Sequence, residues 1–275
     1  MTTVREVTGH YSDGMLLARL NAALKDDGAD PARPTAEALA PYDHFHGRGL
    51  EATEEMANSL TVTAGDHLLD IGSGIGGPAR YLAKRFGCRV TGIDLTAEFC
   101  EVARKLSALL GMQKQVRFEE GDALRMPFPE AAFSGAYSMN VSMNIADKTA
   151  LYREIRRVLK PGGWLLLSEV AKGPGPALDF PTPWAATKDA SFLQTPEETR
   201  AGLEEAGFRI ERVEDKMAET KAFGKRARER AERGEKPLHR AVELIHGGRA
   251  PAAMANMSAG LKEGRVVPIE ILARA

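Results

Sequence analysis

The chain has 275 residues, of which 43% are hydrophobic, and this is enough to bury the core of one large domain with appendages. Its 37 lysines and arginines nearly cancel its 38 aspartates and glutamates, so no overall positive field favours nucleic acid or an anionic membrane. No apolar run reaches the roughly 20 residues that a membrane-spanning helix needs. Two cysteines, Cys88 and Cys100, and a start unlike a signal peptide predict a cytoplasmic protein without disulfides.

Residues 1–60 are predicted to form a helical lead-in that covers the active site. Apolar residues recur at helical spacing between Met15 and Leu24, and prolines, of which Pro41 is the last, should break the helical pattern that follows. The segment 42–49 is dense in polar groups that bind ligands. A further helix is expected from 51 to 60.

Residues 61–170 alternate apolar strands with amphipathic helices, which predicts an α/β fold with a parallel sheet. A turn at 160–163 should separate the last of these helices from the strand that follows it. The carboxyl ends of parallel strands meet at one edge of the sheet, and ligands bind there in open α/β folds. The five expected strands are 67–71, 88–94, 116–119, 132–137 and 164–168.

The last hundred residues are less regular. Residues 171–194 form an excursion rich in proline and glycine that is too long for an ordinary connection, so it is predicted to be a lid or a disordered insert. Residues 195–275 are expected to complete the sheet around a helical insertion. The expected elements are a helix at 195–206, a strand at 209–213, a solvated basic helix at 221–233 and a closing strand at 266–272.

The stretch 67–77 reads as a strand, a tight turn and the start of a helix. Gly72, Gly74 and Gly77 satisfy the spacing G-x-G-x-x-G, and Asp94 lies twenty residues beyond Gly74. An acid at that distance can accept hydrogen bonds from ribose hydroxyls. The pattern therefore predicts a ligand that contains adenosine, and a nicotinamide cofactor and S-adenosylmethionine both do.

Asp70, at the end of the first strand, distinguishes these two ligands. Its carboxylate would repel the pyrophosphate of a nicotinamide cofactor, whereas the amino group and sulfonium of S-adenosylmethionine are positively charged. Asp70 therefore favours the methyl donor, although the residue could also serve only to cap a turn.

Four motifs, in this order and spacing, resemble those of class I S-adenosylmethionine-dependent methyltransferases: 69–77, 92–94, 121–123 and 159–163. The resemblance covers roughly residues 60–170. It implies a Rossmann-like, doubly wound sheet of seven strands in which only the last strand is antiparallel. The predicted cofactor-binding residues are Asp70, Gly72, Ser73, Gly74, Gly76, Asp94, Leu95, Asp122, Ala123 and Asn140.

A narrower resemblance extends along the chain. The segments 44–53, 76–80, 141–148, 183–184 and 191–193 are similar to small-molecule methyltransferases of the sarcosine and dimethylglycine N-methyltransferase type. This resemblance implies a small amine as the methyl acceptor and leaves a homodimer open. Nucleic acid is not an expected substrate, because no Asn/Asp-Pro-Pro-aromatic segment follows the fourth strand.

The predicted substrate residues are Tyr42, His44, His46, Arg48 and Trp184. Arg48 is a candidate clamp for an acceptor carboxylate, and aromatic faces at Tyr42, Phe45 or Trp184 could attract a methylated ammonium. Trp184 could equally be a packing anchor, and the histidines could bond only within their loop.

Direct in-line displacement of the methyl group requires no obligatory base. If the acceptor is an amine, Glu169 or one of the two histidines could take its proton. No metal site is predicted. The alternatives are O- or C-methylation of a small natural product, a nicotinamide-dependent oxidoreductase and a non-catalytic S-adenosylmethionine-binding protein.

Overall fold

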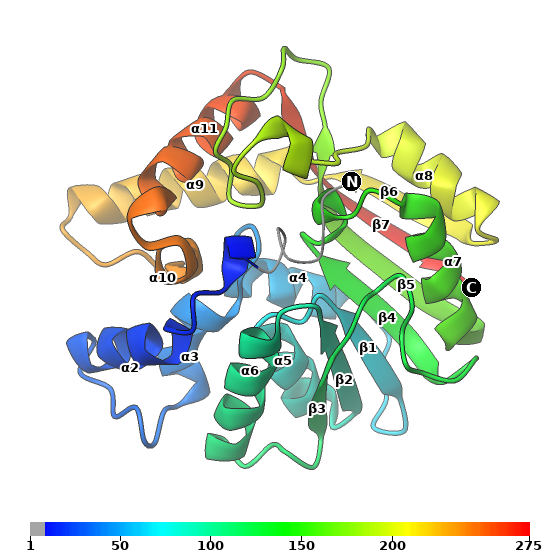
Figure 1. Cartoon of the computed structure of the whole chain (residues 1–275), viewed down its shortest axis with the longest axis horizontal. Coiled ribbons are helices and arrows are strands. Elements are labelled where there is room, and N and C mark those ends of the chain that lie inside the picture. Colours follow the sequence, from blue (N-terminus) through cyan, green and yellow to red (C-terminus); the bar gives the residue numbers. More distant parts are fainter. Residues whose placement is uncertain (1–8) are drawn as a thin grey trace.

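Seven strands form one sheet at the centre of the computed structural model, which describes residues 9–275 (Figure 1). The strand order is β3-β2-β1-β4-β5-β7-β6. Strand β7 pairs antiparallel with both of its neighbours, and every other neighbouring pair is parallel. The predicted α/β fold, with one antiparallel strand at the end of the chain, is confirmed.

The strands are β1 (His67–Ile71), β2 (Arg89–Asp94), β3 (Val116–Glu120), β4 (Phe133–Met139), β5 (Leu159–Lys172), β6 (Arg209–Asp215) and β7 (Val266–Arg274). The α-helices are α2 (Leu16–Asp26), α3 (Ala36–Asp43), α4 (Leu50–Ser59), α5 (Gly77–Phe86), α6 (Ala97–Leu109), α7 (Lys148–Val158), α8 (Pro196–Glu205), α9 (Met217–Glu232), α10 (Ala241–His246) and α11 (Ala250–Lys262). Short 3-10 helices are η1 (Ser142–Asn144), η2 (Lys188–Ala190) and η3 (Gly247–Arg249).

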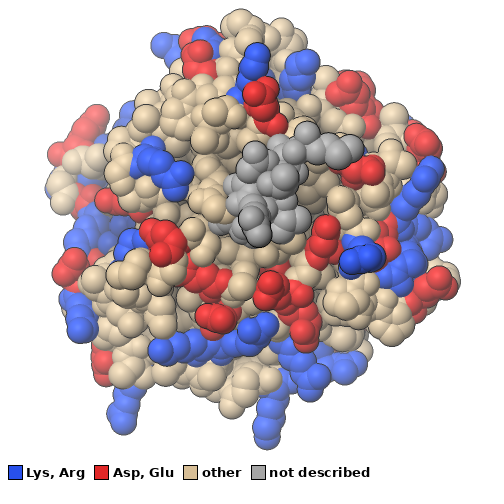
Figure 2. Space-filling view, in the orientation of Figure 1, with Lys and Arg blue, Asp and Glu red and all other residues tan. Residues whose placement is uncertain are grey.

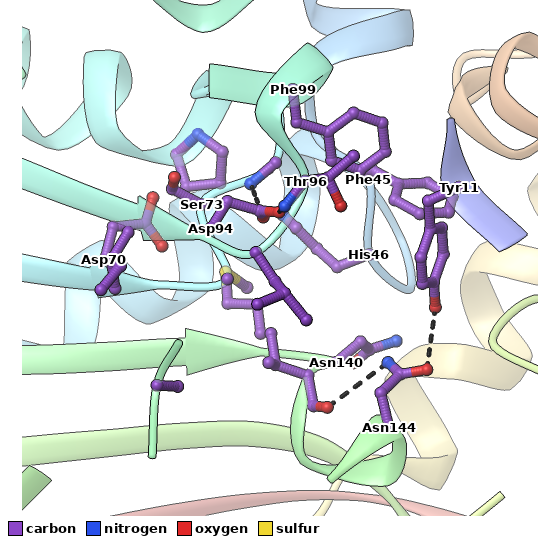
Figure 3. Close-up of a pocket in the computed structure, with 18 of the residues that line it drawn as sticks. Tyr11, Phe45, His46, Asp70, Ser73, Asp94, Thr96, Phe99, Asn140 and Asn144 are labelled. Carbon is purple, nitrogen blue, oxygen red and sulfur yellow. Dashed lines mark hydrogen bonds between the residues drawn. The ribbon is translucent and has the colours of Figure 1, made fainter. Parts of the chain in front are cut away.

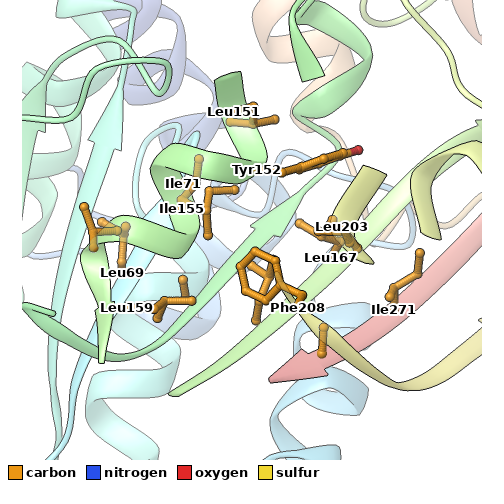
Figure 4. Close-up of a cluster of buried hydrophobic side chains, with 14 of the residues drawn as sticks. Leu69, Ile71, Leu151, Tyr152, Ile155, Leu159, Leu167, Leu203, Phe208 and Ile271 are labelled. Atoms are coloured by element: carbon orange, nitrogen blue, oxygen red, sulfur yellow. The ribbon is translucent and has the colours of Figure 1, made fainter. Parts of the chain in front are cut away.

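Apolar side chains cover both faces of the sheet, which is why the parallel strands are continuously hydrophobic. Leu69 faces a buried cluster with Ile155 of α7 and Leu203 of α8 (Figure 4). Leu68, one residue earlier, points to the opposite face and joins a cluster with Leu82 of α5. Successive side chains of a strand alternate between faces, so this pair places helices on both sides of the sheet.

The expected turn at 160–163 lies inside a strand instead. Strand β5 begins at Leu159, which pairs with Phe133, and the next pair in the register is Gly135 with Trp164. The intervening residues are an irregularity in the ladder, and Gly162 adopts a left-handed conformation with φ 74°. Its N–H donates to the carbonyl of Ala275, so the backbone of the expected turn is paired with the end of the chain.

One expected helix limit, at Pro41, is wrong. Pro41 does not break the helical pattern but lies inside α3, two residues before its end, so the helix continues past a residue that has no N–H to donate. Thr96 precedes α6 as its N-cap residue, but its side chain makes no capping bond. Its N–H donates to Asp94 Oδ1 at 2.9 Å instead.

The lead-in helices dock against the C-terminal insertion. Leu16, Leu20 and Leu24 of α2 form a third buried cluster with Leu244 and Ile245 of α10. Figure 1 shows α2, α3 and α10 on the same side of the molecule, beside the edge of the sheet that holds the strand ends. Segments more than two hundred residues apart in the sequence therefore cover that edge together.

Helix α9 has no buried side chain, as expected of a solvated helix. On the face shown in Figure 2, basic and acidic side chains are interspersed without a large region of one sign. No helix within residues 9–275 is both long and apolar enough to cross a membrane.

Candidate cofactor and substrate pocket

A pocket with about 980 Å³ of empty space, part of it open to solvent, lies where β1, β2 and β4 end (Figure 3). Nine of the ten predicted cofactor residues line it: Asp70, Gly72, Ser73, Gly74, Asp94, Leu95, Asp122, Ala123 and Asn140.

The glycine-rich turn crosses from β1 to α5 over the end of β2. Gly72 adopts φ 70°, its N–H donates to the carbonyl of Ile93, and a Cβ on it would collide with the side chain of Val141. Gly74 adopts φ 52° and has open space where a Cβ would stand. Both positions therefore require glycine for the backbone conformation, and Gly74 in addition leaves the pocket open.

Gly76 is the predicted residue that does not line the pocket. It adopts φ 84° immediately before α5, and a Cβ there would collide with the ring of Phe118 and with the guanidinium of Arg80. This glycine lets the helix begin close to the sheet.

Asp94 joins the turn to the second strand. Its Oδ2 accepts a hydrogen bond from the N–H of Gly74 at 2.8 Å, and its Oδ1 accepts one from the N–H of Thr96. Burial raises the pKa of this carboxyl, and the two backbone donors act in the opposite direction. The carboxylate is thus held in one orientation at the pocket, where ribose hydroxyls could reach it.

Three buried side-chain oxygens at the pocket, Asp70 Oδ2, Ser73 Oγ and Asp43 Oδ1, accept no well-formed hydrogen bond among the described residues. The Tyr137 hydroxyl nonetheless lies beside the Asp70 carboxyl, and His44 Nε2 lies 3.5 Å from Asp43 Oδ1. Burial raises the pKa of Asp70 to about 7. Buried polar atoms are normally paired, so these oxygens are available to a ligand that donates hydrogen bonds. The amino group of S-adenosylmethionine is a positively charged donor that these atoms could bind, and the residues present therefore fit this cofactor.

Aromatic rings line another part of the pocket. The ring of Tyr11 lies 6.0 Å from that of Phe45 and 6.1 Å from that of Phe99, measured between centroids. The Tyr11 hydroxyl donates to Asn144 Oδ1 at 3.1 Å, and Asn144 belongs to the loop that follows β4 (Figure 3). His46 also lines this part of the pocket.

Asn140, which precedes this loop, is left-handed with φ 58°. With its side-chain amide oriented to satisfy both neighbours, its nitrogen donates to the carbonyl of Ser168 and its oxygen accepts from the N–H of Gly47. The residue therefore connects β5 to the segment that carries Phe45 and His46.

Four of the five predicted substrate residues do not line the pocket. The Tyr42 hydroxyl donates to Asp27 at 2.7 Å, and the Arg240 guanidinium stacks on the Tyr42 ring. Arg48 makes a bidentate pair with Glu55 at 2.7 and 2.8 Å, so its donors are already engaged. The remaining predicted residues, His44 and Trp184, also lie elsewhere.

His44 and His46 meet at one buried hydroxyl. His44 Nδ1 lies 2.8 Å and His46 Nε2 lies 3.1 Å from Thr53 Oγ1. The other ring nitrogen of His46 lies 3.2 Å from the carbonyl of Gly47. Burial lowers the pKa of both histidines, so both rings are neutral at pH 7. Both ring nitrogens of His46 have protein partners. The ring is therefore better suited to a fixed part of the pocket lining than to accepting a proton from the substrate.

Trp184 anchors the excursion 171–194. Its side chain is buried in a cluster with Met143 and Val266, and its Nε1 donates to Ser191 Oγ at 2.9 Å. This geometry corresponds to the packing alternative, in which the ring holds the excursion against the sheet.

Glu169 lies behind the loop that follows β4. Its carboxylate accepts hydrogen bonds from the N–H groups of Val141 and Ser142 at 3.2 Å, and it does not line the pocket. Burial raises its pKa to about 7. The Nζ of Lys148 donates to the carbonyls of Ser142, Ile145 and Phe192. These two buried groups hold the loop and join it to the excursion.

Sequence reasoning did not select Tyr11, Asp43, Phe99 or Asn144 as site residues. Asp43 lies within the polar segment 42–49, so the polar composition of that segment could have identified it as a candidate site residue. Tyr11 carried no local signal, because its place at the pocket depends on how the N-terminal segment folds back over α6.

The central part of the chain matches a protein-family model. Residues 69–167 match the model described as Methyltransferase domain. This part of the chain is therefore a methyltransferase domain. S-adenosylmethionine is the cofactor of this domain, as the glycine-rich turn and Asp70 predicted. Among residues 9–275, no group of three or more His, Cys, Asp or Glu side chains is arranged to hold a metal ion.

Curated relatives of the methyltransferase domain act on different atoms. Over 133 residues the chain is 37% identical to phosphoethanolamine N-methyltransferase 3 of Arabidopsis thaliana, a match that covers 48% of this chain and 27% of the relative. It is 35% identical over 128 residues to sterol 24-C-methyltransferase of Eremothecium gossypii, covering 46% of this chain and 32% of the relative. Both matches span about a third of the relative's length or less.

Solved structures share the fold over nearly the whole chain. The [4+2]-cyclase SpnF has a TM-score of 0.69 at 23% identity and covers 99% of this chain and 96% of its own. Phosphoethanolamine N-methyltransferase 2 of Haemonchus contortus, in complex with phosphomonomethylethanolamine and S-adenosylhomocysteine, has a TM-score of 0.69 at 21% identity, with coverages of 94% and 59%. A putative sarcosine dimethylglycine methyltransferase from Galdieria sulphuraria has a TM-score of 0.59 at 19% identity, with coverages of 82% and 83%. At these identities the likeness concerns the fold, and a cyclase shares it.

Proposed function

We propose that the protein transfers the methyl group of S-adenosylmethionine to the nitrogen of a small amine. The observation that carries the proposal is that three buried oxygens of residues lining the pocket, Asp43 Oδ1, Asp70 Oδ2 and Ser73 Oγ, accept no well-formed hydrogen bond among the described residues. They suit the charged amino group of the donor, and the rings of Tyr11, Phe45 and Phe99 line the same pocket, where an acceptor would meet them. The N-methyltransferases among the relatives support an amine as that substrate.

The chain's own residues would act mainly by position. When bound, the cofactor supplies an activated methyl group on a positively charged sulfur. Asp94 would orient the ribose, and Asp122, whose Oδ1 already accepts from the N–H of Leu124, would lie near the adenine. The loop 140–145 and the ring of Tyr11 would exclude water and hold the amine in line with the methyl group.

The proposal is tested first by binding and then by turnover. Calorimetry should show binding of S-adenosylmethionine and no binding of NAD, because the acids at the pocket disfavour a pyrophosphate. Incubation with methyl-labelled donor and a panel of amines, phenols, carboxylates and thiols should then yield S-adenosylhomocysteine and N-methylated products, identified by mass. Methylation of oxygen or carbon alone would reject N-methylation, and binding without any turnover would indicate a non-catalytic binding protein.

We also propose a cytoplasmic location, supported by two cysteines that are both free and buried. A homodimer stays a prediction that sedimentation analysis of the full chain can test. The division into a lead-in at 1–60, a core at 61–170, an excursion at 171–194 and a C-terminal completion at 195–275 likewise stays a prediction.

A further inference from the structure

Three aromatic side chains from separate segments converge on the pocket. Tyr11 comes from the start of the described chain, Phe45 from the segment after α3 and Phe99 from the first turn of α6. The Tyr11 ring meets Phe45 at an angle of 78° and Phe99 at 57°. Rings tilted toward one another in this way present π-faces and edges to a shared space (Figure 3).

The charged side chains that line the pocket within the described residues are of one sign. Within residues 9–275 its lining includes the carboxylates of Asp43, Asp70, Asp94 and Asp122, and no lysine or arginine. Two arginines lie close in the sequence to lining residues, but both have carboxylate partners. Arg48 is paired with Glu55, and Arg80 donates to Asp43 Oδ2 at 2.9 Å and to the carbonyl of Ile75.

This lining offers an anionic group on the acceptor no cationic partner among the described residues. Asp70, Asp94 and Asp122 are assigned to the donor, so the acceptor would meet the aromatic part of the pocket, where a phosphate or carboxylate would lose water without gaining an ion pair. An ammonium group or an apolar body would instead gain from the aromatic faces, since ring quadrupoles attract cations and the rings bury apolar surface.

We infer that the acceptor is an amine without a phosphate or carboxylate group, held against the rings of Tyr11, Phe45 and Phe99. The inference rests on the proposed N-methylation. It separates this chain from the phosphoethanolamine N-methyltransferases to which its central domain is similar, and also from the glycine-derived acceptor that the segment 44–53 predicts.

Matched pairs of amines test the inference on the full-length protein. Ethanolamine is compared with phosphoethanolamine, and 2-phenylethylamine with phenylalanine, so that each pair differs by one anionic group. Labelled donor and mass analysis give kcat/KM for each amine. We expect the amine without the anion to be preferred at least about tenfold in each pair in which methylation occurs, equivalent to 1.4 kcal/mol.

The possible failures are distinguishable. If the phosphorylated or carboxylated member is methylated equally well or better, the inference is overturned while N-methylation stands. If no amine in a broad panel is methylated although the donor binds, the proposed function fails and the inference fails with it.

Two variants test the role of the rings, using a preferred amine from the panel. Phe45→Leu keeps an apolar side chain but removes the ring, and should raise the KM of the amine about fivefold to tenfold while the donor Kd changes less than twofold. Phe128→Leu makes the same change in a ring outside the pocket, which packs against the buried cluster of Leu69 and Ile155. This variant should leave the KM of the amine unchanged. An unchanged KM in Phe45→Leu, or an equal rise in both variants, would contradict the assigned role.

Discussion

At the scale of single residues, Asp70 shows a conflict between stability and binding. Its side chain is 3% exposed and one carboxylate oxygen accepts no well-formed hydrogen bond among the described residues, so burial raises its pKa from 3.8 to about 7. The folded chain therefore holds this proton more tightly than the unfolded chain. The associated stability is fully present below about pH 4 and is lost as the pH rises to about 7.

Asp70→Asn should accordingly stabilise the ligand-free protein and impair donor binding. At pH 8 the variant should gain up to about 4 kcal/mol in unfolding free energy, following about 1.36 kcal/mol per pKa unit, and the gain should vanish toward pH 4. Its Kd for S-adenosylmethionine should rise at least about tenfold, because a charge-assisted bond is lost. Denaturant unfolding at both pH values and calorimetry measure these effects. Donor binding equal to that of the unsubstituted protein would contradict the role of Asp70.

Arg48 illustrates how a partner changes the role expected of a residue. Its guanidinium is mostly buried and makes a bidentate pair with Glu55, 33% of whose side chain is exposed. An arginine whose donors are engaged is poorly placed to clamp a carboxylate in a pocket that it does not line.

We expect Arg48→Ala to lower the unfolding free energy by about 1–3 kcal/mol, since the pair is partly desolvated, and to leave the amine KM unchanged. Glu55→Gln is the matched control, because it weakens the same pair from the other side and should act in the same direction. Thermal unfolding and steady-state kinetics separate the two effects. A tenfold rise in KM for carboxylated amines alone, seen in Arg48→Ala but not in Glu55→Gln, would support Arg48 as a clamp for the acceptor carboxylate.

At the scale of elements, the excursion 171–194 is attached to the sheet by packing. Trp184 is buried against Met143 of η1 and Val266 of β7, and the carbonyl of Phe192 accepts from Lys148 of α7. The pKa of Lys148 is lowered to about 8 by its burial. The excursion therefore supports the loop after β4 from behind.

Trp184→Ala should destabilise the protein by about 3–5 kcal/mol through the cavity that it leaves. Trp184→Phe retains most of the packing but loses the bond to Ser191, and a smaller loss of about 1–2 kcal/mol is expected. Because the ring does not line the pocket, Trp184→Phe should leave the amine KM within twofold of its original value. A larger change in KM without loss of stability would indicate that Trp184 contacts substrate.

At the scale of the whole molecule, the N-terminal helices and the C-terminal insertion bind to each other beside the pocket. Asp27, at the end of α2, pairs with Arg240 and Lys236 of the C-terminal insertion and accepts from the Tyr42 hydroxyl. The N–H of Arg240 donates to the carbonyl of Pro41, and His239 Nε2 lies 3.0 Å from the carbonyl of His44. These contacts position the segment that carries Phe45 and His46.

Asp27→Asn should loosen this junction. The Arg240 guanidinium, above all, lowers the pKa of Asp27, so the ion pair stabilises the fold at neutral pH and is lost as the pH falls through the acid range. We expect a loss of about 1–3 kcal/mol at pH 7 that shrinks toward acid pH, with a rise in amine KM larger than any change in donor Kd. The nearby Asp26→Asn is a control with an exposed carboxyl. Equal donor and amine effects would show that the junction supports the whole pocket.

The cofactor half of the pocket could be predicted from the sequence because its residues follow strands in a fixed sheet register. Asp70, Gly72, Gly74 and Asp94 line the pocket, and their spacing was sufficient to place them there. Strand and helix periodicity likewise predicted the α/β fold, since burial on both sheet faces imposes it on each segment locally.

The acceptor half was decided only by the tertiary structure. Tyr11, Phe45, Phe99 and Asn144 come from four segments whose approach depends on how α2, α3 and α10 pack, and no local pattern encodes that packing. The chemistry of Arg48 suggested a clamp, but its position beside Glu55 gives its charge another partner. Short-range spacing thus determined the proposed donor site, whereas long-range packing determined which side chains line the proposed acceptor site.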